Sequence, residues 1–140
     1  GVLDALSGRS SPTMTDLDLI PVLCHRALQE RLTPQRMRLS LPGARQALDL
    51  RRKGLEALHR RWSQQSLTRS EVQALRQAVL EGGRELEGLE RCLRHLQTWS
   101  KGGETGCLRS ALAAYESSQG FWRRHVRCVL ALAPEMSCRE

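Results

Sequence analysis

The chain has 140 residues, of which 40% are hydrophobic, and a formal net charge of +7. This length suits one domain with its own core, and no apolar run approaches the roughly 18 residues that a membrane-spanning helix needs. Aromatic residues make up only 4% of the chain, so leucine and alanine must fill the core, which favours helices over sheets.

The positive charge is concentrated in one part of the chain. Residues 26–61 alone carry a net charge of +7, and arginine supplies 20 of the 22 basic residues. Arginine makes planar, bidentate contacts with carboxylates and phosphates. The pattern therefore suits either a basic face for an acidic protein, nucleic acid or anionic membrane, or a solvated surface on which arginines pair with glutamates. The glutamates available for such pairing are Glu81, Glu85, Glu87 and Glu90.

Three segments are expected along the chain. Residues 1–15 are rich in Gly, Ser, Pro and Thr, which predicts a flexible linker. Residues 16–133 then form the helical domain, and 134–140 follow as a tail. The first residue is Gly1 rather than Met, so we expect the sequence to be a fragment of a longer protein.

Prolines mark the first two helix starts. A helix is predicted over 19–31, with Asp18 as its cap and Pro21 in its first turn, where no intrahelical N–H bond is lost. Thr33 followed by Pro34 predicts a cap and the first residue of one short, separate turn of helix.

A longer helix is predicted over 41–65, with Ser40 as its cap and Pro42 in its first turn. Its apolar stripe consists of Ala44, Leu48, Leu55, Leu58 and Trp62. Arg51 occupies an apolar position of this stripe, as His125 does in the last helix. Such a residue either fixes the register of packed helices at a cost in stability or marks a groove that a partner helix fills. Both interpretations stay open at this point.

The strongest signal is an apolar ladder on a helix predicted over 69–100. Thr68 and Glu71 form a capping box that marks its start. The ladder alternates steps of three and four residues, which places its members on one helix face. These members are Val72, Leu75, Val79, Gly82, Leu86, Leu89, Leu93 and Leu96. Gly82 permits a kink in the middle, whereas the unchanged phase of the ladder after it favours a continuous helix.

A loop is predicted over 101–106 and a last helix over 107–133. Short loops between long helices make neighbouring helices antiparallel. Small residues beside the ladder (Ala78, Gly83 and Cys92) widen its apolar face, as contact with a third helix requires. The sequence therefore predicts an all-α fold, an antiparallel bundle of three or four helices with coiled-coil-like packing.

Residues 41–133 resemble a spectrin-type repeat. The resemblance is carried by three long antiparallel helices with Trp62, the 72–96 ladder and Trp122 on their core stripes. It implies a cytoskeletal linker, or a scaffold module of the kind found in adaptor proteins and Rho exchange factors.

Motifs for catalysis are missing from the sequence. The two Gly-Gly pairs lack the strand and the Lys-Ser/Thr of a phosphate-binding loop, and no nucleophile elbow is present. We therefore expect no enzymatic activity, no cofactor and no metal. The sharpest alternative is zinc, because Cys92 and His95 lie three residues apart, as do His125 and Cys128, and two facing helices could supply four ligands.

The cysteines form an odd set of five without tight spacing: Cys24, Cys92, Cys107, Cys128 and Cys138. This pattern favours free thiols in a reducing compartment. We therefore expect a cytoplasmic protein, with the nucleus as an alternative location.

The function predicted from the sequence is a non-enzymatic protein–protein interaction or scaffold module of a larger intracellular protein. An apolar groove would take a partner helix, and an arginine-rich face would select an acidic partner. The arginines expected on that face are Arg51, Arg52, Arg60, Arg61, Arg123, Arg124 and Arg127. Self-association through the 72–96 ladder is also possible. The alternatives are a basic domain that binds nucleic acid or an anionic membrane surface, and a secreted four-helix cytokine-like protein.

Overall fold

The computed structural model describes residues 16–132, which form four α-helices and, within this range, no strand. The helices are α1 (Ile20–Leu28), α2 (Pro34–Ser63), α3 (Arg69–Ser100) and α4 (Gly106–Leu132). The predicted all-α helical bundle is confirmed. The linker predicted at 1–15 and the tail predicted at 134–140 lie outside the described residues.

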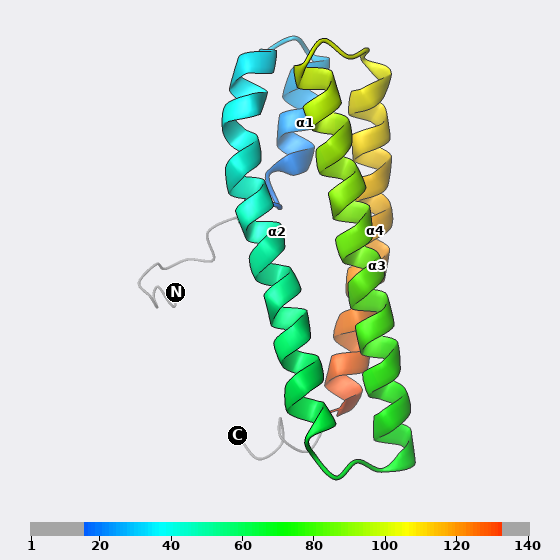
Figure 1. Ribbon diagram of the computed structural model, residues 1–140. Coiled ribbons are helices and arrows are strands. Elements are labelled where there is room, and N and C mark those ends of the chain that lie inside the picture. Colours follow the sequence, from blue (N-terminus) through cyan, green and yellow to red (C-terminus); the bar gives the residue numbers. More distant parts are fainter. Residues whose placement is uncertain (1–15, 133–140) are drawn as a thin grey trace, which may run out of the picture.

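The three long helices run antiparallel to their neighbours along the chain, and α3 holds the bundle together (Figure 1). α3 packs along α4 and, less extensively, against α2, whereas α1 packs on α4. Among the described helices, the backbones of α2 and α4 do not pack along each other, and side chains such as Arg51 and Trp122 meet between them. The bundle therefore depends on α3 to connect its two outer long helices.

The α3 helix confirms the predictions made for it. Its capping box is formed, because the Thr68 hydroxyl accepts the Glu71 N–H at 3.2 Å and the Glu71 carboxylate accepts the Thr68 N–H at 2.8 Å. The helix is continuous through Gly82, so the glycine pair does not break it. Most of the ladder is buried: Leu75, Gly82, Leu86, Leu89, Leu93 and Leu96.

The break predicted near Ser40 is wrong. Thr33 caps α2 as predicted, accepting the Arg36 N–H at 3.2 Å, but the helix then continues through Pro42. Ser40 does not cap a new helix; its hydroxyl donates to the carbonyl of Arg36. The residues buried on one stripe here are Met37, Leu41, Ala44 and Leu48. Burial of two large side chains, at about 1.5–3 kcal/mol each, offsets the roughly 3 kcal/mol that an internal proline costs.

The first helix is shorter than predicted. It begins at Ile20 with Leu19, not Asp18, at its N-cap position. It ends at Leu28, close to Glu30, whose φ of 59° is incompatible with a continuing helix. At 1.5 Å per residue, nine residues span about 13 Å, against about 45 Å for the thirty residues of α2.

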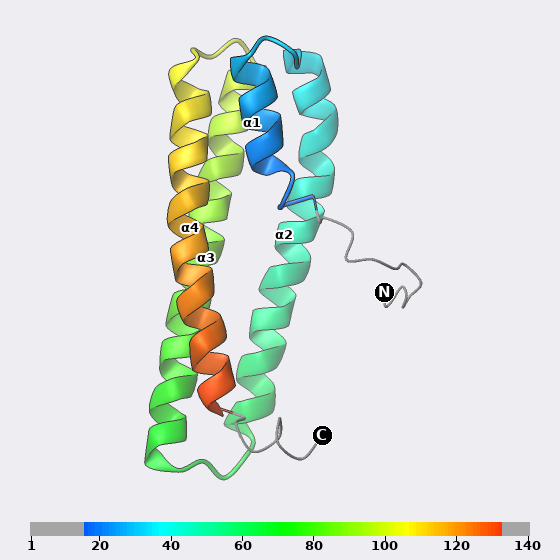
Figure 2. The ribbon, with the colours of Figure 1, turned by 180° about the vertical axis from the view of Figure 1, so that it is seen from behind.

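Because α1 is short, it covers only one end of the bundle. Figure 2 shows it between α2 and α4 at the end near the α3–α4 loop, with no helix between them further down. The main cluster of buried apolar side chains lies at the end of the bundle that α1 covers. Its α2 members come only from Met37 to Leu48, and its α4 members only from Leu108 to Tyr115.

Replacement of a buried ladder residue tests where the stability resides. Leu89 is completely buried, whereas Leu39 on α2 is 81% exposed. Leu89→Ala should lower the free energy of unfolding by about 2–5 kcal/mol, through lost burial and the cavity left behind. Leu39→Ala should change it by less than about 0.5 kcal/mol. Urea unfolding followed by circular dichroism measures both, and equal effects would contradict the assignment of the core.

Candidate functional site

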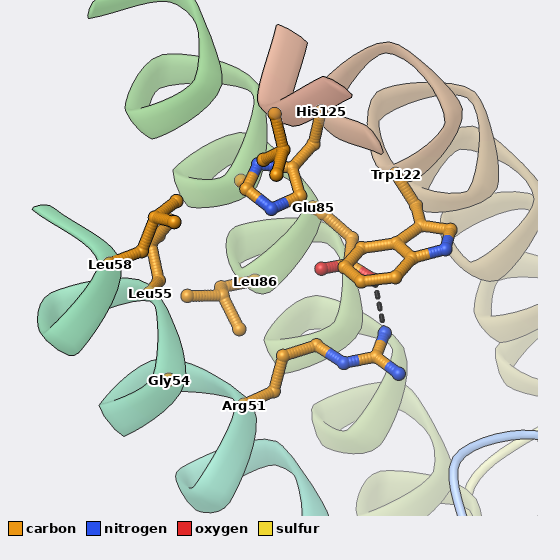
Figure 3. A pocket seen from close by; sticks show the side chains of 10 residues that line it. Arg51, Gly54, Leu55, Leu58, Glu85, Leu86, Trp122 and His125 are labelled. Atoms are coloured by element: carbon orange, nitrogen blue, oxygen red, sulfur yellow. Dashed lines mark hydrogen bonds and ion pairs between the residues drawn. The ribbon is translucent and has the colours of Figure 1, made fainter. Parts of the chain in front are cut away.

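A groove lies between α2 and α4 at the end of the bundle that α1 does not reach. It encloses about 250 Å³. We call it the α2/α4 groove and define it by its lining residues, which come from three helices (Figure 3): Arg51, Gly54, Leu55 and Leu58 from α2, Gly82, Glu85 and Leu86 from α3, and Trp122, His125 and Val129 from α4.

The apolar lining continues onto exposed parts of both outer helices. On α2, Leu50, Gly54 and Leu58 follow one another at intervals of four, which places them on one helix face; Leu50 is 62% exposed. On α4, Val126 and Leu130 continue the same interval from Trp122, and both are exposed. The groove is thus flanked by apolar side chains that no helix among the described residues covers.

Gly82 allows α3 to approach the other two helices closely at the base of the groove. A Cβ added at this position would lie 2.8 Å from Leu55 Cδ1 and 3.0 Å from His125 Nδ1. A side chain here would force the Leu55 side chain and the His125 ring to move. The ladder therefore carries glycine here because the side chains of α2 and α4 occupy the space.

Arg51 and Glu85 form an ion pair on one side of the groove. A guanidinium Nη of Arg51 bonds to Glu85 Oε2, and its Cζ lies 4.5 Å from the centroid of the Trp122 ring, a cation–π distance. Arg51 thus joins α2, α3 and α4 at the level where the groove begins. Arg51 occupies an apolar position of the α2 stripe, which the sequence alone did not explain. Glu85 and Trp122 are the partners that accommodate its charge at this position.

The burial of the glutamates corrects an expectation from the sequence. Glu81 and Glu85 were expected on a solvated helix face, but both are buried, and Glu85 is only 1% exposed. Burial raises the pKa of the Glu85 carboxyl above its usual range, although Arg51 acts in the opposite direction. In each residue the second oxygen, Oε1, is buried without a hydrogen-bond partner among the described residues.

His125 is held against the groove by a hydrogen bond to the backbone. Its Nδ1 lies 2.7 Å from the carbonyl oxygen of Ala78, and this oxygen can only accept, so Nδ1 donates. Its ring stacks on Trp122 at a centroid distance of 5.3 Å. His125, like Arg51, is therefore a polar residue on an apolar helix stripe that has a specific partner, here the carbonyl of Ala78.

The structure divides the predicted arginine face into two groups. Three of its members are engaged inside the domain: Arg51 with Glu85, Arg52 with Glu90 at 4.0 Å, and Arg124 with Glu81 at 3.3 Å. The other four are exposed and make no ion pair with a residue of 16–132: Arg60, Arg61, Arg123 and Arg127.

Helix register places three of these four arginines near the groove. Arg61 follows Leu58 by three residues, on the same side of α2, whereas Arg60 lies about 200° around the helix from Leu58 and away from the groove. Arg123 and Arg127 directly follow Trp122 and Val126 on α4. The groove therefore has positive charge on both of its outer edges that no residue of 16–132 pairs with.

The zinc hypothesis finds no support in the geometry. Within residues 16–132, no group of three or more His, Cys, Asp or Glu side chains is placed to hold a metal ion. Cys92 is packed in the core, and burial raises the pKa of its thiol to about 12. Because zinc binds the thiolate, such a thiol is a poor ligand at neutral pH.

The chain was compared with models of protein families, with curated proteins and with solved structures, and none of the three comparisons gave a match. None of the described helices combines the length and apolar character needed to cross a lipid bilayer. The site must therefore be interpreted from its own geometry.

Replacement of Glu85 tests the effect of its burial. Because its folded pKa is raised above the ordinary value of 4.5, its contribution to the free energy of unfolding falls as pH rises through the folded pKa. Glu85→Gln does not titrate, so the variant should gain stability relative to the wild type as pH rises above about 4.5, and the difference should be constant at lower pH. Urea unfolding across a pH series measures this difference. An opposite slope would mean that the Arg51 ion pair outweighs burial.

Proposed function

We propose that this domain is a non-enzymatic protein–protein interaction module that binds an amphipathic helix of another protein in the α2/α4 groove. The observation that carries the proposal is the position of the groove. It continues the line of α1 between α2 and α4 (Figure 2), where a fourth helix of full length would lie. Along about 30 Å of the bundle, no helix of residues 16–132 takes this place, and this length corresponds to about 20 helical residues.

The composition of the groove supports a helix as its ligand. Its walls present Leu55, Leu58, Trp122 and Val129, a set of aliphatic and aromatic side chains of the kind that receives apolar residues spaced at i, i+3, i+4 and i+7. Trp122 in particular offers a large contact area in a half-buried position. We infer that the partner helix inserts its apolar face between α2 and α4 and completes a four-helix arrangement.

The edge arginines, which form no ion pair within the described part of the chain, support an acidic partner. Arg61, Arg123 and Arg127 would face the flanks of a helix docked in the groove. Acidic residues on these flanks would accelerate association and orient the helix, with a smaller effect on final affinity. This narrows the arginine face predicted from the sequence to Arg61, Arg123 and Arg127.

We also propose an intracellular location and a scaffold role, as the spectrin-type resemblance implies. Cys24 and Cys92 are free thiols buried in the core, and Cys107 and Cys128 are free as well. Free thiols of this kind support a reducing compartment over a secreted cytokine-like protein.

A side chain placed inside the groove should abolish binding. Gly54 lines the groove, and a Cβ there would meet no atom within 4 Å. Gly54→Trp should therefore leave the fold intact and weaken binding by at least about tenfold, because the indole fills the site. The probe is a designed, fluorescein-labelled amphipathic helix of about 20 residues, with leucines on one face and glutamates on its flanks; anisotropy gives its Kd.

Gly83 provides the matched control. It is also a glycine inside a helix with open space around its Cβ, but it lies on the α2–α3 side, outside the groove. Gly83→Trp should bind the peptide like the wild type. Equal loss in both variants, or none in Gly54→Trp, would show that the peptide binds elsewhere.

Charge reversal on the groove edges should slow association. The triple variant Arg61→Glu, Arg123→Glu and Arg127→Glu should reduce the association rate of the same peptide by about tenfold at low salt, because steering depends on long-range attraction. The difference should shrink as salt is raised, since screening shortens the range of charge interactions. Stopped-flow anisotropy at several salt concentrations measures this effect.

A control with the same change in charge separates local from global effects. Arg31, Arg36 and Arg38 are exposed at the opposite end of the bundle. Their replacement by Glu should slow association much less. If both triple variants behave alike, only the net charge of the domain matters and the edge arginines have no special role.

A further inference from the structure

The end of the α2/α4 groove that meets α1 carries negative charge. Asp16 comes just before α1 and packs on α2, so closely to Gly43 that a Cβ there would overlap its carboxylate. Glu116 is exposed on α4 and lines a hollow beside Pro21, in the first turn of α1. Neither carboxylate makes an ion pair with a residue of 16–132. One of them therefore lies on each side of the point where α1 begins (Figure 2).

The far end of the groove, near the α2–α3 loop, carries positive charge. Arg61 lies ten residues beyond Arg51 on α2, which places it about 15 Å further from α1. Arg127 lies eleven residues beyond Glu116 on α4, or about 16 Å. Arg123 lies between the two groups and lines the same hollow as Glu116, so it marks neither end. The edges thus change from negative to positive over the length of one docked helix.

The two helices that form the groove run in the same direction. α2 and α4 are each antiparallel to α3, and α1, which lies between them at the other end of the bundle, runs opposite to both (Figures 1 and 2). A helix docked in the groove in the direction of α1 would therefore be antiparallel to both of its neighbours. Antiparallel packing places opposite ends of the helix dipoles side by side, which is the favourable arrangement.

We propose that the groove binds its partner helix in one direction, with the N-terminus near the α2–α3 loop and the C-terminus against the start of α1. This inference rests on the proposed function, because it describes the helix that the groove receives. In this direction the first half of the helix lies near Arg61 and Arg127, and its last two turns lie near Asp16 and Glu116. The partner is then a helix with acidic residues in its first half and basic residues in its last two turns.

The dipole of the docked helix favours the same distribution of charge. Acidic residues stabilise the N-terminal turns of a helix, and basic residues stabilise the C-terminal turns. In the proposed direction, each set of charges meets the opposite charge on the groove edges. In the reverse direction, the charges that match the groove edges would destabilise the docked helix itself.

A photoreactive peptide tests the direction. The probe is a designed helix of about 20 residues with leucines on one face, glutamates on the flanks of its first half and lysines on the flanks of its last two turns. One version carries a benzophenone group at its N-terminus, and the other carries it at its C-terminus. Mass spectrometry should place the first cross-link on residues 58–69 and the second on residues 16–21 or 43–47. Gly54→Trp should prevent both cross-links.

Removal of the two carboxylates tests the charge at the α1 end. Asp16→Asn combined with Glu116→Gln should weaken binding of this peptide about threefold to tenfold at low salt, because its lysines lose both partners. Glu56→Gln combined with Glu87→Gln makes the same change in net charge at exposed positions outside the groove, and should leave the Kd nearly unchanged. Anisotropy of the fluorescein-labelled peptide measures both, and circular dichroism checks that both variants fold.

The outcomes separate this inference from the proposed function. If the cross-links appear in the reversed pattern, or equally at both ends, and Gly54→Trp prevents them, the groove binds a helix but the proposed direction is refuted. If the two double variants weaken binding alike, or neither weakens it, the carboxylates do not select a basic end of the helix and that part of the inference is wrong. If Gly54→Trp prevents no cross-link, the groove is not a helix site and both proposals fail.

Discussion

The length of α1 is the constraint on which the rest of the structure depends. The nine residues of α1 cover one end of a scaffold of three long helices. The main cluster of buried apolar side chains lies at that same end. At the other end no further helix of residues 16–132 lies between α2 and α4, which are connected by α3 and by side-chain contacts such as that of Arg51 with Trp122. Apolar side chains of both helices consequently line an open groove. If α1 extended by several turns toward its N-terminus, it would bury this lining, and the domain would have no site of this kind.

The Arg51–Glu85 pair is hard to explain as a device for stability. Burial raises the pKa of Glu85 even with Arg51 beside it, which means that burial outweighs the attraction between the two charges. Apolar replacements of such pairs are often neutral or stabilising. The pair also leaves one oxygen unsatisfied. What the pair does provide is a connection between helices, because Arg51 of α2 bonds to Glu85 of α3 and lies over the Trp122 ring of α4.

Sequence patterns predicted the helices better than they predicted the groove. The ladder, the capping box at Thr68 and the cap at Thr33 depend on local spacing, and each is found in the structure. Pro42 was misleading because local propensity argued for a break while burial of the surrounding stripe keeps the helix continuous. The groove depends on α1 being much shorter than α2. This difference is set by the positions at which α1 begins and ends, and the sequence signals at both positions are weak. Glu85 looked like a surface residue because its partner Arg51 lies 34 positions away in the sequence.

The arginines show how far composition alone can be interpreted. The excess of arginine over lysine suggested a surface that binds anions, yet several of these arginines make contacts inside the domain. Arg51 lies over Trp122, and Arg84 and Arg124 lie near the ring of Phe121 at 5.9 and 4.8 Å, where a planar guanidinium packs better than an ammonium. Arg124 also neutralises the buried Glu81. The charge that remains for a partner is therefore smaller than +7 suggests, and its position beside the groove argues for an acidic helix rather than a long anionic polymer.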